Sequence, residues 1–175
     1  NYADKLTGSA GNNALSGGAG NDVLNGGAGA DTLTGGDGSD SYYVDNIGDI
    51  VSETNASAST GGTDLVNSSL SAYTLGANVE NGRITTTGTA SLTGNALANT
   101  LYAAAGSNTL DGSLGTDTVS YLYATAGVTV SLATTAAQAT GGSGSDTLKN
   151  VENLTGSNYA DKLTGSAGNN ALSGG

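Results

Sequence analysis

The side chains of this sequence that could do chemistry are carboxylates, and they recur at a fixed spacing. Asp4, Asp22 and Asp40 stand eighteen residues apart, and Asn13 and Asp31 keep the same interval nine residues out of phase. Stacked carboxylates repel one another unless a cation lies between them. Because the chain has no His and no Cys, its oxygen ligands favour a hard cation over soft or borderline metals. Ca²⁺ fits best, since it accepts about six to eight oxygens, whereas Mg²⁺ retains its waters and demands a stricter octahedron.

Nonapeptides hold these residues in place. Three are consecutive, GGAGNDVLN (17–25), GGAGADTLT (26–34) and GGDGSDSYY (35–43), and a fourth, GGSGSDTLK, stands at 141–149. Each reads Gly-Gly-x-Gly-x-Asp-x-U-x, where U is a large apolar residue. The glycines allow positive φ and a sharp turn, and the x-U-x triplet favours a short β-strand with one inward side chain. Two nonapeptides therefore make an 18-residue coil, and successive coils stack at about 4.8 Å.

Weaker copies keep the period but lose some positions. GSAGNNALS (8–16) has Asn where Asp belongs, and GSNYADKLT (156–164) has Tyr in place of the third Gly. Residues 94–120 retain the apolar position but have Asp at the sixth position of only one nonapeptide, Asp117. We therefore expect a degenerate second block of the same coils.

The stacked turns are the predicted metal sites, with a carboxylate from each of two turns and backbone carbonyls as ligands. The predicted site residues are Asp4, Asn13, Gly18, Gly20, Asp22, Gly27, Gly29, Asp31, Gly36, Gly38, Asp40, Asn99, Asp117, Gly142, Gly144, Asp146, Glu152, Asp161 and Asn170. Asn99 and Asp117, again eighteen apart, form a weaker pair. Asp45, Asp49 and Asp64 either add ligands at the ends of blocks or lie in solvated loops.

The nonapeptides resemble the RTX repeats of secreted bacterial proteins. The resemblance implies an all-β fold, a right-handed parallel β-roll (a β-solenoid) with short strands, glycine-rich calcium-binding turns and several bound Ca²⁺ ions. It extends to the segments at 40–53, 61–84, 125–148 and 150–165. It also implies secretion by the type I route, with a chain that is unfolded in the cytosol and folds in extracellular calcium.

An eighteen-residue segment occurs twice without a single change. NYADKLTGSAGNNALSGG stands at 1–18 and again at 158–175. The sequence thus reads as slightly more than one period of a tandem array with a unit of 157 residues. We expect head-to-tail contacts between units, either covalently linked or in separate chains. Because the chain does not begin with Met, we also expect it to be a segment of a longer protein.

The chain divides into five expected segments. They are a calcium-binding block (1–43), a β-rich inter-block segment (44–93), a degenerate block (94–120), a strand and loop segment (121–140) and a final RTX block (141–175). A unit of 157 residues is about 8.7 coils of eighteen, so loops are expected within 53–63 and 133–140. The shortened segment 150–155 is expected to place Glu152 in register with Asn170. Gly82, which stands where the other Val-Glu-Asn motif has Leu154, predicts a bulge.

Composition excludes several classes of function. The net charge of −11 and the pI of about 4.1 argue against nucleic acid and anionic membrane surfaces as partners. No apolar run approaches the ~18 residues of a membrane span. Without His or Cys, Ser-His and Cys-His catalysis are excluded, and we expect no enzymatic activity.

Three functions remain. The first is a calcium-dependent structural module that stacks into a rod or fibre on a bacterial surface or in an extracellular matrix. The second is an export and folding tail of a secreted hydrolase, although such tails are usually single short blocks. The third is an adhesin or ice-binding surface, for which the Thr-rich stretches at 85–89 and 134–140 are the only indication, and β-propensity on solvent faces accounts for them better.

Overall fold

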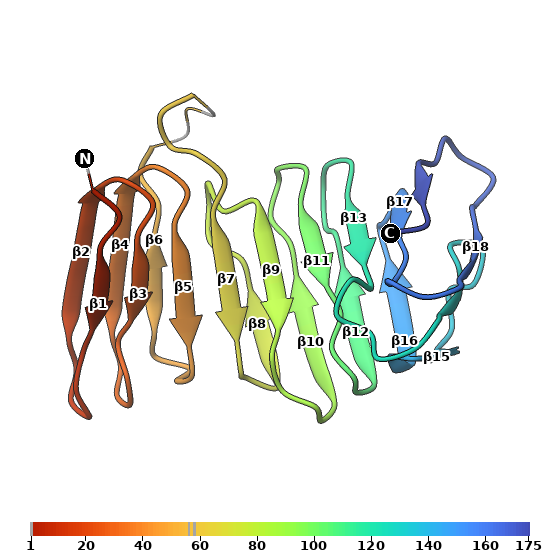
Figure 1. Cartoon of the computed structure of the whole chain (residues 1–175), viewed down its shortest axis with the longest axis horizontal. Coiled ribbons are helices and arrows are strands. Elements are labelled where there is room, and N and C mark those ends of the chain that lie inside the picture. Colours follow the sequence, from red (N-terminus) through yellow and green to blue (C-terminus); the bar gives the residue numbers. More distant parts are fainter. Residues whose placement is uncertain (1, 56, 58) are drawn as a thin grey trace.

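The chain folds into a long stack of short strands. The computed structural model describes residues 2–55, 57 and 59–175. These residues form nineteen β-strands that follow one another along the long axis of the molecule (Figure 1). Helices are absent from the described residues, so none there is long and apolar enough to cross a bilayer. The predicted all-β fold is confirmed.

One face of the stack is a nine-stranded sheet in which every neighbouring pair is parallel. Its strands are β1 (Lys5–Thr7), β3 (Val23–Asn25), β5 (Ser41–Val44), β7 (Leu65–Ser68), β9 (Asn81–Ile84), β11 (Thr100–Tyr102), β13 (Thr118–Ser120), β17 (Asn153–Thr155) and β19 (Leu172–Ser173). Pairs such as Leu6 with Leu24, and Leu24 with Tyr42, keep the eighteen-residue register. The nonapeptide period thus sets the pairing directly.

The opposite face is made by the strands that alternate with these along the chain. It contains β2 (Ala14–Ala19), β4 (Thr32–Asp37), β6 (Ile50–Ser52), β8 (Ala72–Thr74), β10 (Ala90–Thr93), β12 (Asn108–Asp111), β14 (Thr129–Ser131), β15 (Gln138–Gly141), β16 (Gly144–Lys149) and β18 (Lys162–Thr164). They form sheets of three, five and two strands. Apart from β14 and β15, each coil contributes one strand to each face, as in the predicted parallel β-roll.

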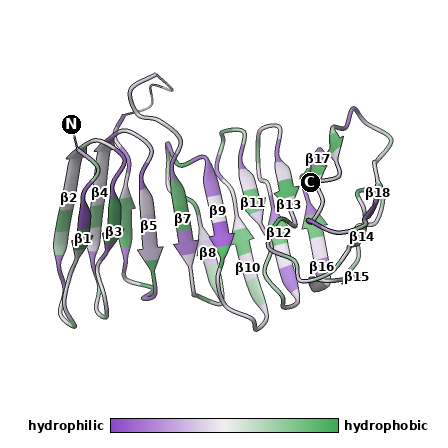
Figure 2. Cartoon of the chain, viewed as in Figure 1, coloured by the Kyte–Doolittle hydropathy of each residue, from purple (hydrophilic) through white to green (hydrophobic). Residues whose placement is uncertain are grey.

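The core is a thin double row of apolar side chains between the two faces. The U residues of the consecutive nonapeptides, Leu24, Leu33 and Tyr42, are completely buried, and Leu148 is 6% exposed. Burial of each such side chain contributes about 1.5–3 kcal/mol. Residues on either side of them point outward, so hydrophobic and hydrophilic positions alternate along the strands, and β9 with Asn81 and Arg83 is coloured as strongly hydrophilic (Figure 2).

Gly82 occupies an inward position of β9 without a bulge. It pairs in regular register with Val66 on one side and Leu101 on the other. A Cβ built on Gly82 would lie 2.9 Å from Leu92 Cδ2 and 3.0 Å from Leu75 Cδ2. The prediction of a bulge is therefore wrong, because leucines from elsewhere in the coil fill the space of the missing side chain.

The nonapeptide at 141–149 forms a hairpin. β15, which ends at Gly141, pairs antiparallel with β16, which begins at Gly144. Gly141 and Gly144 have φ of 81° and 82°. These two glycines pair with each other and flank the two-residue connection, Gly142 and Ser143, and glycine adopts positive φ at little cost. The stacked turn expected here is therefore not formed, and Gly142 and Gly144 belong to the hairpin.

The hairpin lengthens one face only. β15 is bridged to Val128 just before β14, and β14 pairs with β18, so β14 and β15 lie between β16 and β18. In the nine-stranded sheet β13, β17 and β19 pair directly. Figure 1 shows β18 displaced outward at this end of the roll.

Two further departures from regularity matter below. Residues 53–63 contain no strand among those described and leave the roll as a loop on one edge (Figure 1); Ala56 and Ala58 of the loop expected there lie outside the described residues. The loop expected within 133–140 is shorter, because β15 begins at Gln138.

The two identical segments lie on exchanged faces. KLT at 5–7 forms β1 of the nine-stranded sheet, whereas KLT at 162–164 forms β18 on the opposite face. Leaving β14 and β15 aside, eight strands of the nine-stranded sheet and seven of the opposite face precede β18. We call one turn with its strand a half-coil. The 157-residue unit therefore advances by fifteen half-coils, an odd number.

Candidate metal centres

A ladder of acidic and amide side chains lines the edge at which the strands of the nine-stranded sheet begin. The side chain of one coil accepts a hydrogen bond from the backbone N–H of the equivalent residue in the coil before it. Oδ1 of Asp22 accepts from the N–H of Asp4 at 2.8 Å, and Oδ1 of Asp40 from Asp22 at 2.7 Å. The same contact joins Asp117 to Asn99 at 2.7 Å. The ladder fixes the register of neighbouring coils.

The same ladder continues through residues outside the consecutive nonapeptides. Oδ1 of Asp64 accepts from the N–H of Asp40 at 2.7 Å, and Oε2 of Glu80 accepts from Asp64 at 2.8 Å. Oε2 of Glu152 accepts from the N–H of Asp117 at 2.8 Å. Asn170 lies next in line, with its Nδ2 donating to the carbonyl of Glu152 at 2.7 Å.

A second ladder lies along the opposite face. Oδ1 of Asp31 accepts from the N–H of Asn13 at 2.7 Å, and Oδ1 of Asp49 accepts from Asp31 at 2.9 Å. Further along, Asp146 accepts from the N–H of Asn108 and Asp161 from the N–H of Val128, both at 2.8 Å. Asp146 and Asp161 are therefore not in successive coils, because β14 and β15 lie between their strands.

Four turns leave a carboxylate oxygen buried and without a hydrogen-bond partner among the described residues. These oxygens are Oδ2 of Asp22, Asp31, Asp40 and Asp117. Each lies over the first glycine of its turn, where a Cβ would overlap the carboxylate, as at Gly17 beneath Asp22. An unpartnered anionic oxygen out of contact with water is costly unless a cation meets it. These turns fit a hard cation, and we call them open turns.

A positive φ four residues before the carboxylate distinguishes the open turns. Gly18, Gly27 and Gly36 have φ of 101°, 84° and 110°, and Gly20, Gly29 and Gly38 are also positive. In the degenerate turn GSLGTD the equivalent residue is Ser113, which has φ of 73°. This is uncommon for a residue with a side chain. The degenerate turn thus keeps the open conformation without the glycine.

Six further turns are closed by their own side chain. In each, the oxygen accepts from the backbone N–H four residues earlier, at 2.6–3.1 Å; the acceptors are Asn13, Asp49, Asn99, Asn108, Asp161 and Asn170. None of the residues that donate has positive φ. The structure therefore divides the predicted ligands, with Asn13, Asn99, Asp161 and Asn170 in closed turns.

The remaining predicted residues have individual surroundings. Asp4 is exposed and contributes its N–H to the ladder. Asp146 is completely buried, and Thr140 Oγ1 lies 3.4 Å from its Oδ2. Asp45 is exposed, whereas Asp64 is 1% exposed.

Two acidic residues were missing from the predicted set, Glu53 and Glu80. Glu80 lies in the motif Val-Glu-Asn at 79–81, which recurs at 151–153 with Glu152. That repetition was a usable signal, because both glutamates extend the first ladder. Glu53 follows β6 at the start of an irregular loop, and the nonapeptide spacing does not predict it as a ligand.

Burial shifts the titration of several ladder carboxyls. Burial raises the pKa of Asp40 and of Asp117, and raises that of Asp146 to about 6. Burial, together with the charges of Asp64 and Asp40, raises the pKa of Glu53 to about 8. Burial likewise raises that of Asp64 to about 7, with added repulsion from Glu80 and Asp40 and a partly offsetting hydrogen bond from the N–H of Asp40.

Asp161 in a closed turn behaves in the opposite way. Although burial acts against it, hydrogen bonds from Val128 and Ser157 hold the pKa of Asp161 below its ordinary value. Its charge is thus stabilised by N–H and O–H donors of the protein, with no need of a cation.

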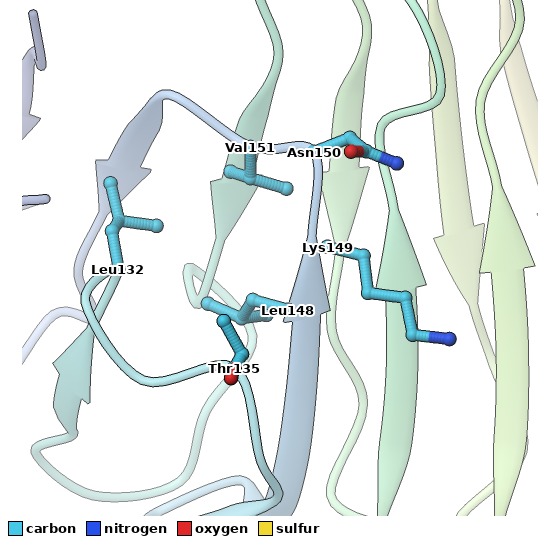
Figure 3. A pocket seen from close by; sticks show the side chains of 6 residues that line it. All are labelled: Leu132, Thr135, Leu148, Lys149, Asn150 and Val151. Atoms are coloured by element: carbon cyan, nitrogen blue, oxygen red, sulfur yellow. The ribbon is translucent and has the colours of Figure 1, made fainter. Parts of the chain in front are cut away.

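The pocket drawn in Figure 3 is lined by none of the ladder residues. Leu132, Leu148 and Val151 line one side with Thr135, and Lys149 and Asn150 extend to the other side (Figure 3). None of its six lining residues carries a carboxylate. It therefore lacks the charged oxygen ligands that the ladders offer a hard cation.

Comparison with known proteins bears on the ladders directly. The family model for the RTX calcium-binding nonapeptide repeat matches four copies, over residues 7–42, 84–120 and 151–175. These ranges contain the four open turns and leave out both the loop at 53–63 and the hairpin. Neither the curated proteins nor the solved structures gave a match.

Proposed function

Because the chain belongs to the RTX calcium-binding repeat family, we propose that it is a calcium-dependent structural module of a secreted bacterial protein, which stacks end to end into a rod. RTX repeats are calcium-binding elements typical of secreted bacterial proteins. The structural role, the stacking and the location at a cell surface or in a matrix are our proposal. The proposed role is mechanical rather than catalytic, with Ca²⁺ as the ion and other copies of the unit as partners.

The observation that carries the proposal is the identity of the two segments at 1–18 and 158–175. Residues 1–18 pair with the next coil in unbroken register, β1 with β3 and β2 with β4. Since residues 158–175 have the same sequence, they offer the same strands and turns to another copy of residues 19–36. A second unit can therefore continue the roll without a change of coil geometry.

The open turns explain why the rod would depend on calcium. They hold buried carboxylates in a chain of net charge −11 with only four Lys and Arg residues. Without a cation, these carboxylates repel one another, and burial in the thin core does not offset the conformational entropy of the chain. With Ca²⁺ between the coils, the same carboxylates join neighbouring turns.

The proposal is tested with one unit and with two units in tandem. In millimolar Ca²⁺ we expect β-type circular dichroism, and in chelator a disordered spectrum. Small-angle X-ray scattering should show that the second unit lengthens the particle by about 36 Å, from fifteen half-coils at about 4.8 Å per coil, with an unchanged cross-section. Identical spectra in both solutions, or a second unit that widens the particle instead, would refute the proposal.

A further inference from the structure

Glu53 brings a third carboxylate to two members of the first ladder. One carboxylate oxygen each of Asp40, Glu53 and Asp64 lies within 4.8 Å of the other two. The three side chains are 2%, 7% and 1% exposed. They come from three elements, Asp40 just before β5, Glu53 just after β6 and Asp64 just before β7. Such a cluster does not occur at the other open turns among the described residues.

Free oxygens point into the cluster. Asp40 Oδ2 and Glu53 Oε2 are buried and lack a hydrogen-bond partner in the described part of the chain. The phenol of Tyr42 donates to the other oxygen of Glu53. A Cβ on Gly35 would overlap Asp40 Oδ2 and Tyr42 OH and approach Glu53 Oε1 at 2.6 Å. The glycine therefore leaves room where these groups converge.

We propose that Asp40, Glu53 and Asp64 together bind one Ca²⁺ ion at the Asp40 open turn, and that this site is the tightest in the chain. An open turn of the repeat offers carboxylates from two stacked turns, whereas this cluster offers three from three elements. Calcium affinity rises with the number of charged ligands. Glu80, whose Oε2 accepts from the N–H of Asp64, adds a neighbouring negative charge. Mg²⁺ is disfavoured, because a buried set of side chains leaves little place for its waters.

The site has a structural consequence that the repeats do not supply. Glu53 and Asp64 flank the irregular loop, and Asp40 belongs to the last of the consecutive nonapeptides. An ion held by all three joins the two ends of the loop to the end of the block. The inference rests on the proposed calcium dependence of the chain and adds two ligands, Glu53 and Asp64, that the nonapeptide pattern does not encode.

The first test is a calcium titration of the 175-residue chain by calorimetry. Glu53→Gln removes the charge but keeps an oxygen that can accept from Tyr42. Asp45→Asn is the matched control, because it removes one charge from an exposed side chain of the same region. We expect Glu53→Gln to weaken the tightest class of sites, one ion per chain, by about tenfold or more, and Asp45→Asn to leave it unchanged. Equal titrations of both variants would overturn the inference.

A second measurement decides the question if Glu53→Gln does not fold in saturating Ca²⁺. Tb³⁺ substitutes for Ca²⁺ and is excited through a nearby tyrosine. We expect the first equivalent of Tb³⁺ on the wild-type chain to emit on tyrosine excitation, and Tyr42→Phe to lose most of that emission. Unchanged emission from Tyr42→Phe, or a silent first equivalent in the wild type, would place the tightest ion elsewhere.

The two proposals fail in different ways. If the wild-type chain folds on adding Ca²⁺ but Glu53→Gln binds as tightly as the wild type, only the three-carboxylate site is refuted. If the wild-type chain neither binds Ca²⁺ nor folds with it, the proposed function itself is refuted.

Discussion

At the scale of the residue, the backbone conformation four residues before a carboxylate decides what the carboxylate meets. Where that residue has positive φ, as Gly18 does before Asp22, the N–H no longer points at the side chain and one oxygen stays free. In six turns where it does not, the side chain accepts that N–H and the turn closes on itself, as at Ser157 before Asp161 at 2.8 Å. The acidic residue alone therefore does not identify an ion site.

This distinction predicts different outcomes for two Asp→Asn substitutions. Asp22→Asn removes charge from an open turn and should lower the overall calcium affinity about tenfold or more, or ~1.4 kcal/mol. Asp161→Asn changes a closed turn and should leave calcium affinity unchanged while lowering stability modestly. Calcium titrations followed by circular dichroism measure both. A larger loss of affinity in Asp161→Asn than in Asp22→Asn would contradict the assignment.

Ser113 offers a gain of stability at the same scale. A left-handed conformation costs a residue with a side chain roughly 1–2 kcal/mol, and glycine avoids that cost. Ser113→Gly should therefore raise the free energy of unfolding in calcium by about 1 kcal/mol. Ser9→Gly, at the equivalent place in a turn without positive φ, is the control and should bring no such gain. Chemical denaturation of the two variants provides the comparison.

At the scale of the element, the strands of the roll depend on contacts across the core as much as on their own sequence. β9 lacks an inward side chain at Gly82, and Leu75 and Leu92 occupy its place. β-Pairing to Val66 and Leu101 nevertheless stays regular. Packing from the opposite side thus compensates locally for an unfavourable residue.

Gly82→Leu restores the apolar residue that the related strand carries, and it should nonetheless destabilise the roll. The new side chain would have to displace Leu75 and Leu92, and overpacking costs about 1–3 kcal/mol. We expect a lower melting temperature in calcium than for the wild type. A higher melting temperature would mean that the space beside Gly82 can be refilled without strain.

The same scale shows why prediction from the sequence succeeds for some elements and fails for others. Coils and inward residues such as Leu24 and Leu33 follow from a local period, because eighteen residues complete each coil. Residues 141–149 have the same glycine-rich sequence pattern as a stacked turn, and only the antiparallel pairing of β15 with β16 distinguishes them. Glu53 reaches Asp40 through the fold, so no interval in the sequence reveals it. The open and closed turns likewise differ in φ, which Ser113 adopts against its own preference.

At the scale of the whole molecule, the raised pKa values make the stability of the ion-free chain depend on pH. Glu53 and Asp64 titrate at about 8 and about 7 in the fold, against 4.5 and 3.8 ordinarily. The folded chain therefore binds more protons than the unfolded chain, and its stability falls as pH rises through this window. Protonation partly replaces the missing cation.

We therefore expect opposite responses to acid with and without calcium. In chelator, lowering the pH from about 8 to about 5 should increase the β signal, because the buried carboxyls become neutral. In Ca²⁺, the same change should weaken folding, because protons compete with the ion for its ligands. Circular dichroism in both solutions is sufficient, and a β signal in chelator that falls on acidification would contradict the burial of these carboxyls.

The odd number of half-coils in a unit has a consequence for the straightness of the proposed rod. β14 and β15 add two strands to one face and none to the other, so we expect them to bend the axis of the unit toward the nine-stranded sheet. In the proposed rod the next unit would have its faces exchanged, and its bend would point the opposite way. We therefore expect successive bends to cancel in pairs, which leaves the rod with a shallow zigzag and no net curvature.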